Sequence, residues 1–534
     1  HNNPMSRYRL KLVKLLLPLF ALIIVFRLFY WQIVRGQELK SRAASQQSST
    51  ATLTAKRGDI LASDRSLLAG TIDTYLLYVY KPQLAIKPDD LIDRLLPILL
   101  EQPPIATTAS TLSPDQYSTK LHDYLKSRLD LDKSWVSLKS HLPRPLKEKI
   151  TALNISGLGF QEEPIRFYPE ASMSAQLLGF VGSDADGMPQ GYFGLEGFYD
   201  RRLQSRQGSL KQETDAQGNP ILIGNFAKFS QKDGLSLLTS VNKGIQYQVE
   251  ALLAAGIAKY GAAAGSVILL DTKTGSVIAL ASLPSYSPDI FYLYPAAQYK
   301  NPAVADLFEP GSVFKPLVMA AAINEDALTP DTQCDDTCNG QVHIGTYTIK
   351  TWNDKYYPKT TMTDVLVHSD NTGMVFTARK LGAEKLSHYL DAYGFGHLTG
   401  IDLQEEVSGQ LRPAPDIKEI DLATMSFGQG IAVTPIQLIT AFNAIANGGL
   451  LVSPHLVSAI VDQNQFLPPP SPPPKRVLKQ TTAQTLTNML IAAVDNGEAK
   501  WAKPKYLQVA GKTGTAQIPI AGNYDDKKTI ASFI

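Results

Sequence analysis

The longest uncharged apolar run of the chain lies close to its first residue. Leu15–Phe26 contains no charge, and apolar positions continue to Val34, which gives the roughly 20 residues that a helix needs to cross a bilayer. Arg27 interrupts the run near its end, where a long side chain can reach the headgroups. We therefore expect a membrane-spanning helix over residues 12–34, with residues 1–11 in the cytoplasm. No small-residue cleavage motif follows the run, so an anchor is favoured over a cleaved signal peptide.

Residues 50–233 mix β-prone and helical patterns. Thr74–Tyr80 is a short run rich in aromatic and β-branched residues, which is typical of a strand. Pro114–Leu129 has helical spacing, with Ser113 as its predicted N-cap and a proline at the first helical position. Glycines are dense over residues 179–197 and predict tight turns and close packing. This part of the chain is therefore expected to be a mixed α/β domain.

The second half of the chain has a different order of elements. Ile245–Tyr260 has apolar residues at helical spacing, and two strands, Ser266–Leu270 and Ser276–Ala281, are joined by a turn at Asp271–Gly275. Helical runs then follow four hydroxyl residues: Ser312, Thr360, Thr434 and Thr481. Two β-prone runs come last: Leu507–Ala510 and Thr529–Ile534. This order predicts an α+β domain over residues 235–534, whose antiparallel sheet is closed by distant segments. Because the printed chain stops within a β-prone run, we expect this domain to be incomplete at its C-terminus.

Charge and cysteine content narrow the functional classes. With 51 Lys and Arg against 49 Asp and Glu, the formal net charge is +2, which argues against binding to nucleic acid. No His, Cys, Asp and Glu cluster has the spacing of a metal site, so neither a metal nor another cofactor is expected. The two cysteines, Cys334 and Cys338, could form a disulfide, remain free thiols or belong to a metal site.

Three short motifs with catalytic potential occur twice each. They are S-x-x-K at Ser240–Lys243 and Ser312–Lys315, S-x-N at Ser240–Asn242 and Ser369–Asn371, and K-T-G at Lys273–Gly275 and Lys512–Gly514. In the first set Ser240 would have to serve two motifs, and Lys273–Gly275 lies in the predicted hairpin turn. We interpret that set as structural, with Ser240 as the residue at which a helix begins and Lys273–Gly275 as a turn.

The second set has the context that nucleophilic catalysis requires. Pro316 is tolerated only in the first turn of a helix, so Ser312 is expected at the helix start, where developing negative charge is stabilised. Lys315 lies three positions later on the same helix face and can act as a base if its pKa is lowered. Ser369–Asn371 follows between helices, and Lys512–Thr515 lies inside a strand-like run from Leu507 to Ile518.

In this order the motifs resemble those of class B penicillin-binding proteins, which are membrane-anchored peptidoglycan D,D-transpeptidases. The similarity extends over nearly the whole chain, through these segments: Arg57–Ile60 with Asp64–Arg65, Arg166–Pro169, Gly179–Gly182, Gly194–Gly197, Phe308–Lys315, Gly428–Gln437 and Gly511–Gln517. It implies a pedestal, or dimerisation-type, domain over residues 50–233 and a penicillin-binding/β-lactamase-like transpeptidase domain over residues 235–534. Glu309 before Pro310 favours the division branch of the family over the elongation branch.

The resemblance implies a catalytic role for five residues. Ser312 would attack the carbonyl between the two terminal D-alanines of a peptidoglycan stem peptide, with Lys315 as its base. Ser369 would relay the proton to the leaving amine, and Asn371 would hold the acyl chain and Lys315. Lys512 would keep Lys315 neutral and supply a positive field. β-Lactams would mimic the D-Ala-D-Ala terminus and trap Ser312.

Substrate binding is expected along the K-T-G strand. The resemblance implies that Thr513 and Thr515 bind the terminal carboxylate, and Gly514 would let a ligand backbone approach closely. Trp352 and Tyr356 could line the groove, but we favour a place in an aromatic core for both.

The resemblance also implies a location and partners. It describes a single-pass protein of the bacterial cytoplasmic membrane, N-terminus inside and catalytic domain on the extracytoplasmic side, which works with a polytopic glycan polymerase and other division proteins. One alternative is a non-catalytic scaffold that activates such a polymerase. Another is a β-lactamase-like hydrolase, against which the absence of a Glu-x-x-Leu-Asn sequence between Asn371 and Lys512 argues.

Overall fold

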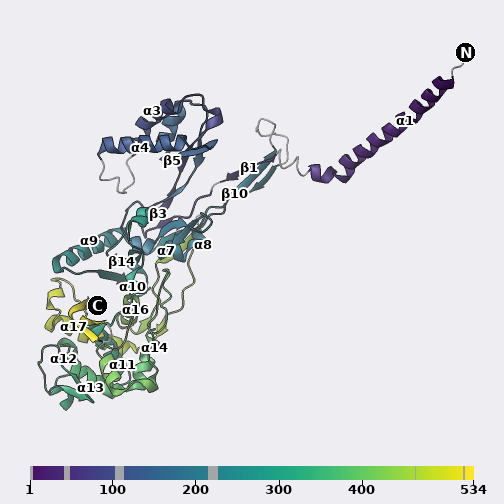
Figure 1. Ribbon diagram of the computed structural model, residues 1–534. Coiled ribbons are helices and arrows are strands. Elements are labelled where there is room, and N and C mark those ends of the chain that lie inside the picture. The colour runs from purple at the N-terminus through teal and green to yellow at the C-terminus, as the bar shows by residue number, and fades with distance from the viewer. Residues whose placement is uncertain are drawn as a thin grey trace. The chain divides into compact units, whose positions relative to one another are not determined.

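The computed structural model describes residues 4–40, 48–53, 55–102, 113–213, 226–463, 465–520 and 523–534 (Figure 1). The chain divides into two compact units. The first combines His1–Lys56 with Ser205–Gly234, and the second combines Arg57–Gln204 with Leu235–Ile534. All of the predicted site residues belong to the second unit.

The first unit carries the apolar helix. Helix α1 runs from Pro4 to Phe29 and continues as a π-helical turn, η1, from Tyr30 to Val34. The span Lys11–Val34 has a mean hydropathy of 2.5 and is long and apolar enough to cross a membrane. The prediction of a helix over residues 12–34 is confirmed. The unit also contains an antiparallel sheet in the order β1 (Ser48–Leu53), β10 (Gly208–Glu213) and β11 (Phe226–Phe229).

A six-stranded sheet joins segments of the second unit that are far apart in sequence. Its order is β19 (Gln465–Leu467), β18 (Val457–Asp462), β12 (Ser236–Thr239), β2 (Ile60–Leu61), β3 (Leu67–Ile72) and β7 (Ile165–Phe167). Strand β12 pairs in parallel with β2 and antiparallel with β18. Backbone hydrogen bonds in this sheet therefore join the two segments of the second unit, Arg57–Gln204 and Leu235–Ile534.

A second sheet packs against three helices. The sheet has the order β5 (Trp135–Pro143), β4 (Thr74–Tyr80) and β6 (Leu158–Glu162), and the helices are α3 (Pro88–Leu99), α4 (Pro114–Leu129) and α5 (Arg144–Ala152). The predicted strand and the predicted helix after Ser113 are both confirmed. The Ser113 hydroxyl accepts from the Gln116 N–H, and the Gln116 side chain accepts from the Ser113 N–H. This reciprocal cap explains why α4 begins where it does.

The glycine-rich segment packs as closely as its composition predicts. It contains three short helices, α6 (Ala175–Leu178), α7 (Gly194–Phe198) and α8 (Asp200–Leu203), and the hairpin of β8 (Phe180–Ser183) with β9 (Pro189–Tyr192). Gly179 has φ +77°, and a Cβ there would lie 2.2 Å from the Phe193 carbonyl oxygen. A Cβ on Gly191 would lie 2.1 Å from the Glu196 carbonyl oxygen. A side chain at either position would force two backbone segments apart.

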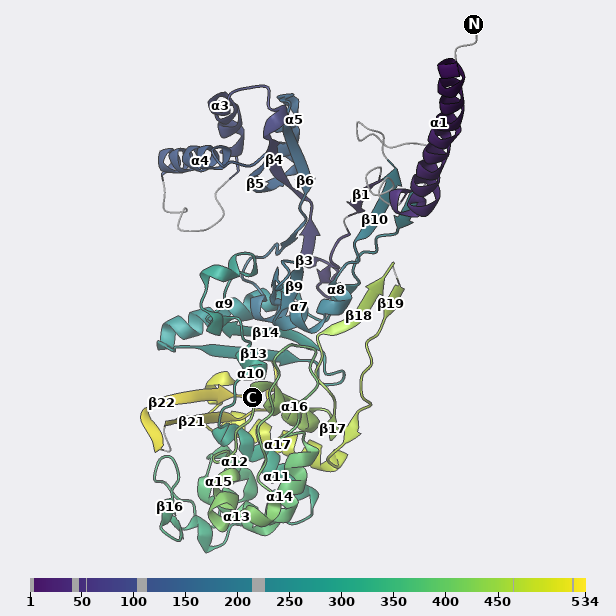
Figure 2. The same cartoon turned by 45° about the vertical axis from the view of Figure 1, so that its right-hand side comes forward.

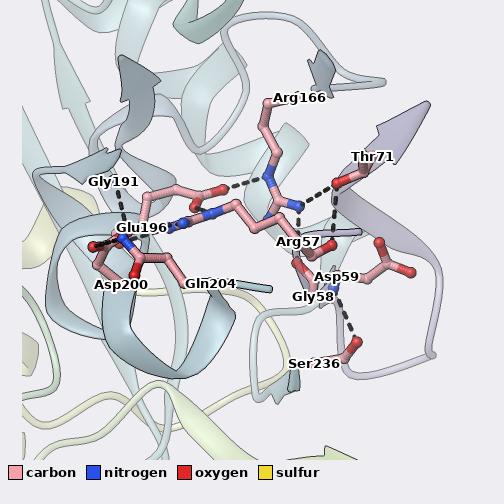
Figure 3. A network of polar contacts seen from close by, with 10 residues as sticks. All are labelled: Arg57, Gly58, Asp59, Thr71, Arg166, Gly191, Glu196, Asp200, Gln204 and Ser236. Atoms are coloured by element: carbon pink, nitrogen blue, oxygen red, sulfur yellow. Dashed lines mark hydrogen bonds and ion pairs between the residues drawn. The ribbon is translucent and has the colours of Figure 1, made fainter. Parts of the chain in front are cut away.

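Buried ion pairs connect this segment to the first residues of the second unit (Figure 3). Arg57 donates from Nε to Glu196 Oε2 at 2.7 Å and from Nη1 to Asp200 Oδ1 at 2.8 Å. Arg166 Nε donates to Glu196 Oε1 at 2.6 Å. Burial alone would lower the pKa of Arg57, but Glu196 and Asp200 raise it, so the guanidinium stays charged. Because Glu196 is completely buried, it serves as a counter-charge for two arginines where water cannot screen them.

Glu196→Gln should destabilise the folded chain by about 3–5 kcal/mol, because it leaves two buried arginines short of a counter-charge. The measurement is the midpoint of urea unfolding of the detergent-solubilised chain. Glu148→Gln is the matched control, since its ion pair with Arg144 is exposed and such pairs contribute little. Equal midpoints for the two variants would show that the buried pairs do not stabilise the fold.

Two long hairpins and nine helices make up most of the remaining described part of the second unit (Figure 2). The hairpins are β13 (Gly265–Leu270) with β14 (Val277–Leu283) and β21 (Thr513–Ile520) with β22 (Asn523–Phe533). The helices are α9 (Lys243–Tyr260), α10 (Pro302–Ala305), α11 (Lys315–Asn324), α12 (Met362–Val367), α13 (Asn371–Leu381), α14 (Ala383–Ala392), α15 (Glu419–Met425), α16 (Pro435–Ala446) and α17 (Gln480–Asn496). Two short strand pairs accompany them, β15 (Val342–Ile344) with β16 (Tyr347–Ile349) and β17 (Leu450–Leu451) with β20 (Lys475–Arg476). The α+β class is confirmed, and among the described residues each hairpin pairs within itself.

The first motif set is structural, although one detail of its interpretation is wrong. Asp271 accepts from N–H groups of the turn and Gly275 has φ +79°, which confirms the hairpin turn. Ser240 does not begin α9. Asn242 caps that helix, because its side-chain oxygen is the one that reaches the N–H of the first turn. The Ser240 hydroxyl instead donates to the Val277 carbonyl at 2.6 Å.

The predicted strand Leu507–Ala510 is wrong. Strand β21 begins at Thr513, and a strand needs a hydrogen-bonded neighbour. The register of β21 with β22 starts at Thr513 opposite Phe533, and among the described residues none pairs with residues 507–510. Leu507 is consequently 72% exposed. The β-prone run Thr529–Ile534 is confirmed as part of β22, apart from its last residue.

Cys334 and Cys338 form a disulfide. The sequence left three states open, which were a disulfide, free thiols and a metal site, and the structure has the disulfide. Both cysteines are buried in the same core as α11 and α13. The bridge thus closes a short loop ahead of β15, and its burial packs that loop against the helices that carry the site.

Candidate active site

Ser312 lies in a 3₁₀ turn, η6 (Gly311–Phe314), that leads directly into α11. The helix begins three residues after Ser312, with Pro316 in its first turn as predicted. Gly311 has φ +62°, and its N–H donates to the Gly428 carbonyl at 3.0 Å, which holds the turn against the segment before α16. Ser312 is half-buried between buried neighbours, so its side chain stays accessible to a ligand.

Lys315 is completely buried at the start of α11. Its Nζ donates to the Ser369 carbonyl oxygen at 2.6 Å and to Asn371 Oδ1 at 2.8 Å, and it lies 3.2 Å from Ser369 Oγ. Burial, followed by the charge of Lys512, lowers the pKa of Lys315 well below the range of a solvated lysine, and Asp370 opposes this shift. A neutral amine has two N–H groups. The two carbonyl acceptors use both, which leaves the lone pair available for a proton.

Lys512 brings a second amine to the same loop. It is 3% exposed, and its Nζ donates to Ser369 Oγ at 2.9 Å and to the Thr513 carbonyl at 3.0 Å. Burial lowers the pKa of Lys512 to about 8. The Ser369 hydroxyl therefore lies between the two lysine nitrogens, within hydrogen-bond distance of each. In this position it can pass a proton between Lys315 and a bound group.

The loop that carries Ser369 is fixed by the residue next to it. Asp370 caps α13, where it accepts from the N–H groups of Thr372 and Gly373 and from the Thr372 hydroxyl. Ser369 has φ +55°, a conformation that costs a non-glycine residue about 1–3 kcal/mol. The cap and the two lysines hold the residue in this conformation. Asp370 therefore supports the loop that carries Ser369.

Asn371 connects the site to a segment that the motifs do not include. Its Nδ2 donates to the Lys350 carbonyl at 2.8 Å, immediately after β16. A backbone carbonyl has no signature in a residue pattern, so the sequence carried no signal for this contact.

Trp352, two residues after Lys350, is 65% exposed, and the aromatic-core interpretation is therefore wrong for this residue. Tyr356 is partly buried.

The K-T-G residues lie on a strand that packs against the Ser312 turn. Thr513 and Thr515 lie on one face of β21 and Gly514 on the other, since side chains alternate along a strand. A Cβ on Gly514 would lie 2.9 Å from the backbone nitrogen of Val313. Glycine is therefore required at position 514 because the strand lies against the backbone of Val313. The sequence, by contrast, indicated the close approach of a ligand as the reason for the same glycine.

Comparisons with known proteins agree on one family. Residues 265–534 match the penicillin binding protein transpeptidase domain, and residues 52–238 match the penicillin-binding protein dimerisation domain. The chain is 31% identical over 540 residues to "Stage V sporulation protein D" of Bacillus subtilis, covering 100% of this chain and 80% of that protein. It is 27% identical over 533 residues to "Probable peptidoglycan D,D-transpeptidase PenA" of Neisseria meningitidis, covering 99% of this chain and 85% of that one. Its fold is similar to that of penicillin-binding protein 2X from Streptococcus thermophilus, with a TM-score of 0.73 and 23% identity over 91% of this chain and 74% of that chain.

The site geometry and these matches lead to the same class. S-x-x-K, S-D-N and K-T-G together are shared by penicillin-binding proteins and class A β-lactamases. A dimerisation domain ahead of the transpeptidase domain distinguishes the former from the latter. The chain belongs to the penicillin-binding proteins, and within them to class B.

Proposed function

We propose that this protein is a peptidoglycan D,D-transpeptidase that cross-links stem peptides through an acyl-enzyme on Ser312. The observation that carries the proposal is the contact of Lys315, Ser369 and Lys512, which combines a buried base, a proton relay and a positive charge beside the serine turn. Membership of the family supports binding of peptidoglycan and of β-lactams. The acyl-enzyme follows from the chemistry of these side chains.

In the first half-reaction, neutral Lys315 takes the hydroxyl proton of Ser312 while Oγ attacks the carbonyl carbon between the two terminal D-alanines. The backbone N–H groups of Ser312 and Thr515 stabilise the oxyanion. The C–N bond then breaks, and the leaving amine receives the proton from Lys315 through the Ser369 hydroxyl. D-alanine leaves, and Ser312 carries the acyl group as an ester.

In the second half-reaction, an amine of a neighbouring stem peptide attacks the ester carbonyl. Its proton passes to Lys315 and then to Ser312 Oγ as the C–O bond breaks. Asn371 aligns the amide of the acyl chain. Thr513 and Thr515 bind the terminal carboxylate of the donor, and Gly514 keeps the strand close to the serine turn.

Two readouts on the detergent-solubilised chain test this proposal. With a synthetic stem pentapeptide we expect release of D-alanine, and with a fluorescent penicillin we expect a covalent adduct. Mass spectrometry should place that adduct on the peptide that contains Ser312. An adduct on the peptide that contains Ser240, or the absence of both reactions in a folded chain, would overturn the proposal.

The acylation rate should fall as the pH rises through about 8, the value to which burial lowers the pKa of Lys512. The reaction needs Lys315 neutral and Lys512 charged, so loss of the Lys512 proton removes the positive field. Lys512→Arg retains its charge at high pH, because arginine does not deprotonate in proteins. The measurement is the rate of penicillin acylation against pH in both proteins. If the acylation rate of the variant falls at the same pH as that of the wild type, loss of the Lys512 proton is not the cause of the decrease.

We also propose a location and partners for this enzyme. Helix α1 with η1 anchors it in the bacterial cytoplasmic membrane, with residues 1–11 inside, and residues 50–233 form a pedestal for the transpeptidase domain of residues 235–534. A polytopic glycan polymerase and other division proteins are the proposed partners, since cross-linking requires newly made glycan at the same membrane. Protease added to intact spheroplasts should digest the catalytic part, and protection of that part would contradict the orientation.

A further inference from the structure

A cavity of about 700 Å³ lies in the second unit, and its lining includes none of the predicted site residues. Four segments form its walls: β9 with α7 and α8, residues 400–404, the region around the start of β18, and the proline-rich residues 468–472. Figure 2 shows the chain after β19 running as an extended segment towards β17, with which β20 pairs. A volume of several hundred cubic ångströms accommodates a small ligand or a few residues of a peptide.

The acidic residues of this cavity already have partners within the protein. Asp200 accepts from Arg57 at 2.8 Å and from the Gly191 N–H at 2.7 Å (Figure 3). Asp402 is buried and accepts from two backbone N–H groups and from the Tyr199 hydroxyl. The charge of Asp200 is therefore balanced by an arginine, whereas Asp402 keeps its negative charge among neutral donors.

Two arginines of the lining have no such partners. Arg201 and Arg202, on α8, are exposed, and neither side chain takes part in a hydrogen bond or ion pair with the described residues. A guanidinium presents its donors in a planar fork that fits a carboxylate. With these two arginines against the single charge of Asp402, the net charge of the cavity is positive.

The proline-rich wall has a complementary chemistry. Pro468, Pro469, Pro470 and Pro472 have no backbone N–H, so at these positions the wall offers carbonyl oxygens and apolar ring surface. A ligand that hydrogen-bonds at these prolines must bring its own donors. A proline-rich segment is stiff before it binds, which reduces the entropy that binding costs. Phe198, which is 50% exposed, adds an aromatic surface.

We propose that this cavity binds a short acidic peptide segment of a partner protein. Its carboxylates pair with Arg201 and Arg202, its backbone N–H groups donate to the proline carbonyls, and an apolar side chain contacts Phe198. An extended peptide supplies all three groups, because successive side chains point to opposite sides and the backbone carries a donor at each residue. An anionic glycan supplies hydroxyls and carboxylates but no large apolar side chain.

The test is fluorescence anisotropy with a labelled hexapeptide of alternating Glu and Leu and the detergent-solubilised full chain. The same peptide with Gln in place of Glu should bind about tenfold or more weakly, and the double variant Arg201→Gln/Arg202→Gln should lose a similar factor. Ser458→Trp, which fills the cavity without a change of charge, should also weaken binding. The double variant Arg94→Gln/Lys120→Gln is the matched control, since it removes the same charge at exposed positions of α3 and α4 and should bind as the wild type does.

Three results would overturn the proposal. They are equal binding of the Glu and Gln peptides, an equal loss of affinity in the control variant, and tighter binding of an oligogalacturonate of the same charge. The rate of penicillin labelling is measured in every variant and should stay at the wild-type value. This second readout confirms that each variant is folded and separates the peptide site from the chemistry at Ser312.

Discussion

Ser312→Ala should abolish both covalent labelling by a fluorescent penicillin and release of D-alanine from a stem pentapeptide. The variant removes the hydroxyl that forms the ester and leaves the 3₁₀ turn and both buried lysines in place. In a serine protease, removal of the nucleophile alone lowers kcat by about 10⁶-fold. The measurement is labelling intensity after gel electrophoresis, together with D-alanine release over a long incubation.

Ser240→Ala is the matched control for this variant. Ser240 has the same spacing to a lysine as Ser312, but its hydroxyl donates to the carbonyls of Val277 and Leu456 at 2.6 and 3.1 Å. Its loss removes hydrogen bonds of the fold and should leave labelling unchanged. Labelling that survives Ser312→Ala would assign the acyl-enzyme to another residue.

Lys315→Arg should lower the rate of acylation by about 10²–10⁴-fold, which is the usual contribution of a positioned general base. Lysine can lose its proton here because burial and the charge of Lys512 lower its pKa. Arginine retains its proton in any such environment, so it keeps the charge and loses the base. The measurement is the second-order rate constant for penicillin acylation, determined at several pH values.

Lys243→Arg supplies the corresponding control. Lys243 belongs to the other S-x-x-K motif and forms an ion pair with Glu170 at 2.6 Å, which arginine can also make. It should acylate at the wild-type rate. Circular dichroism and the unfolding midpoint establish that both variants are folded. A folded Lys315→Arg variant that acylates within a few-fold of the wild type would remove Lys315 from the mechanism.

Local elements of this protein follow from residues that are close in sequence. The cap of α4 depends on Ser113 and Gln116, three positions apart, and the hairpin turn depends on Asp271 and Gly275. Both are predicted because short-range hydrogen bonds and a positive φ leave a residue signature. The wrong strand at 507–510 shows the limit of this reasoning, since a strand also needs a distant partner.

The candidate site also has features that the residue order predicts and features that it does not. The order of Ser312, Ser369 and Lys512 is visible in the chain, but their proximity is not. Three-dimensional contacts decide that the Ser369 hydroxyl lies between two lysines and that Asn371 bonds to the Lys350 carbonyl. No motif contains these distances.

The apolar helix, the local caps and turns, and the identity of the reactive side chains can therefore be predicted from the order of the residues. The tertiary structure alone decided how basic Lys315 and Lys512 are, and that Glu196 is shared by two arginines. The physical reason is that turns and caps arise from neighbours along the chain. A pKa or a buried ion pair depends instead on which distant segments meet and on how completely they exclude water.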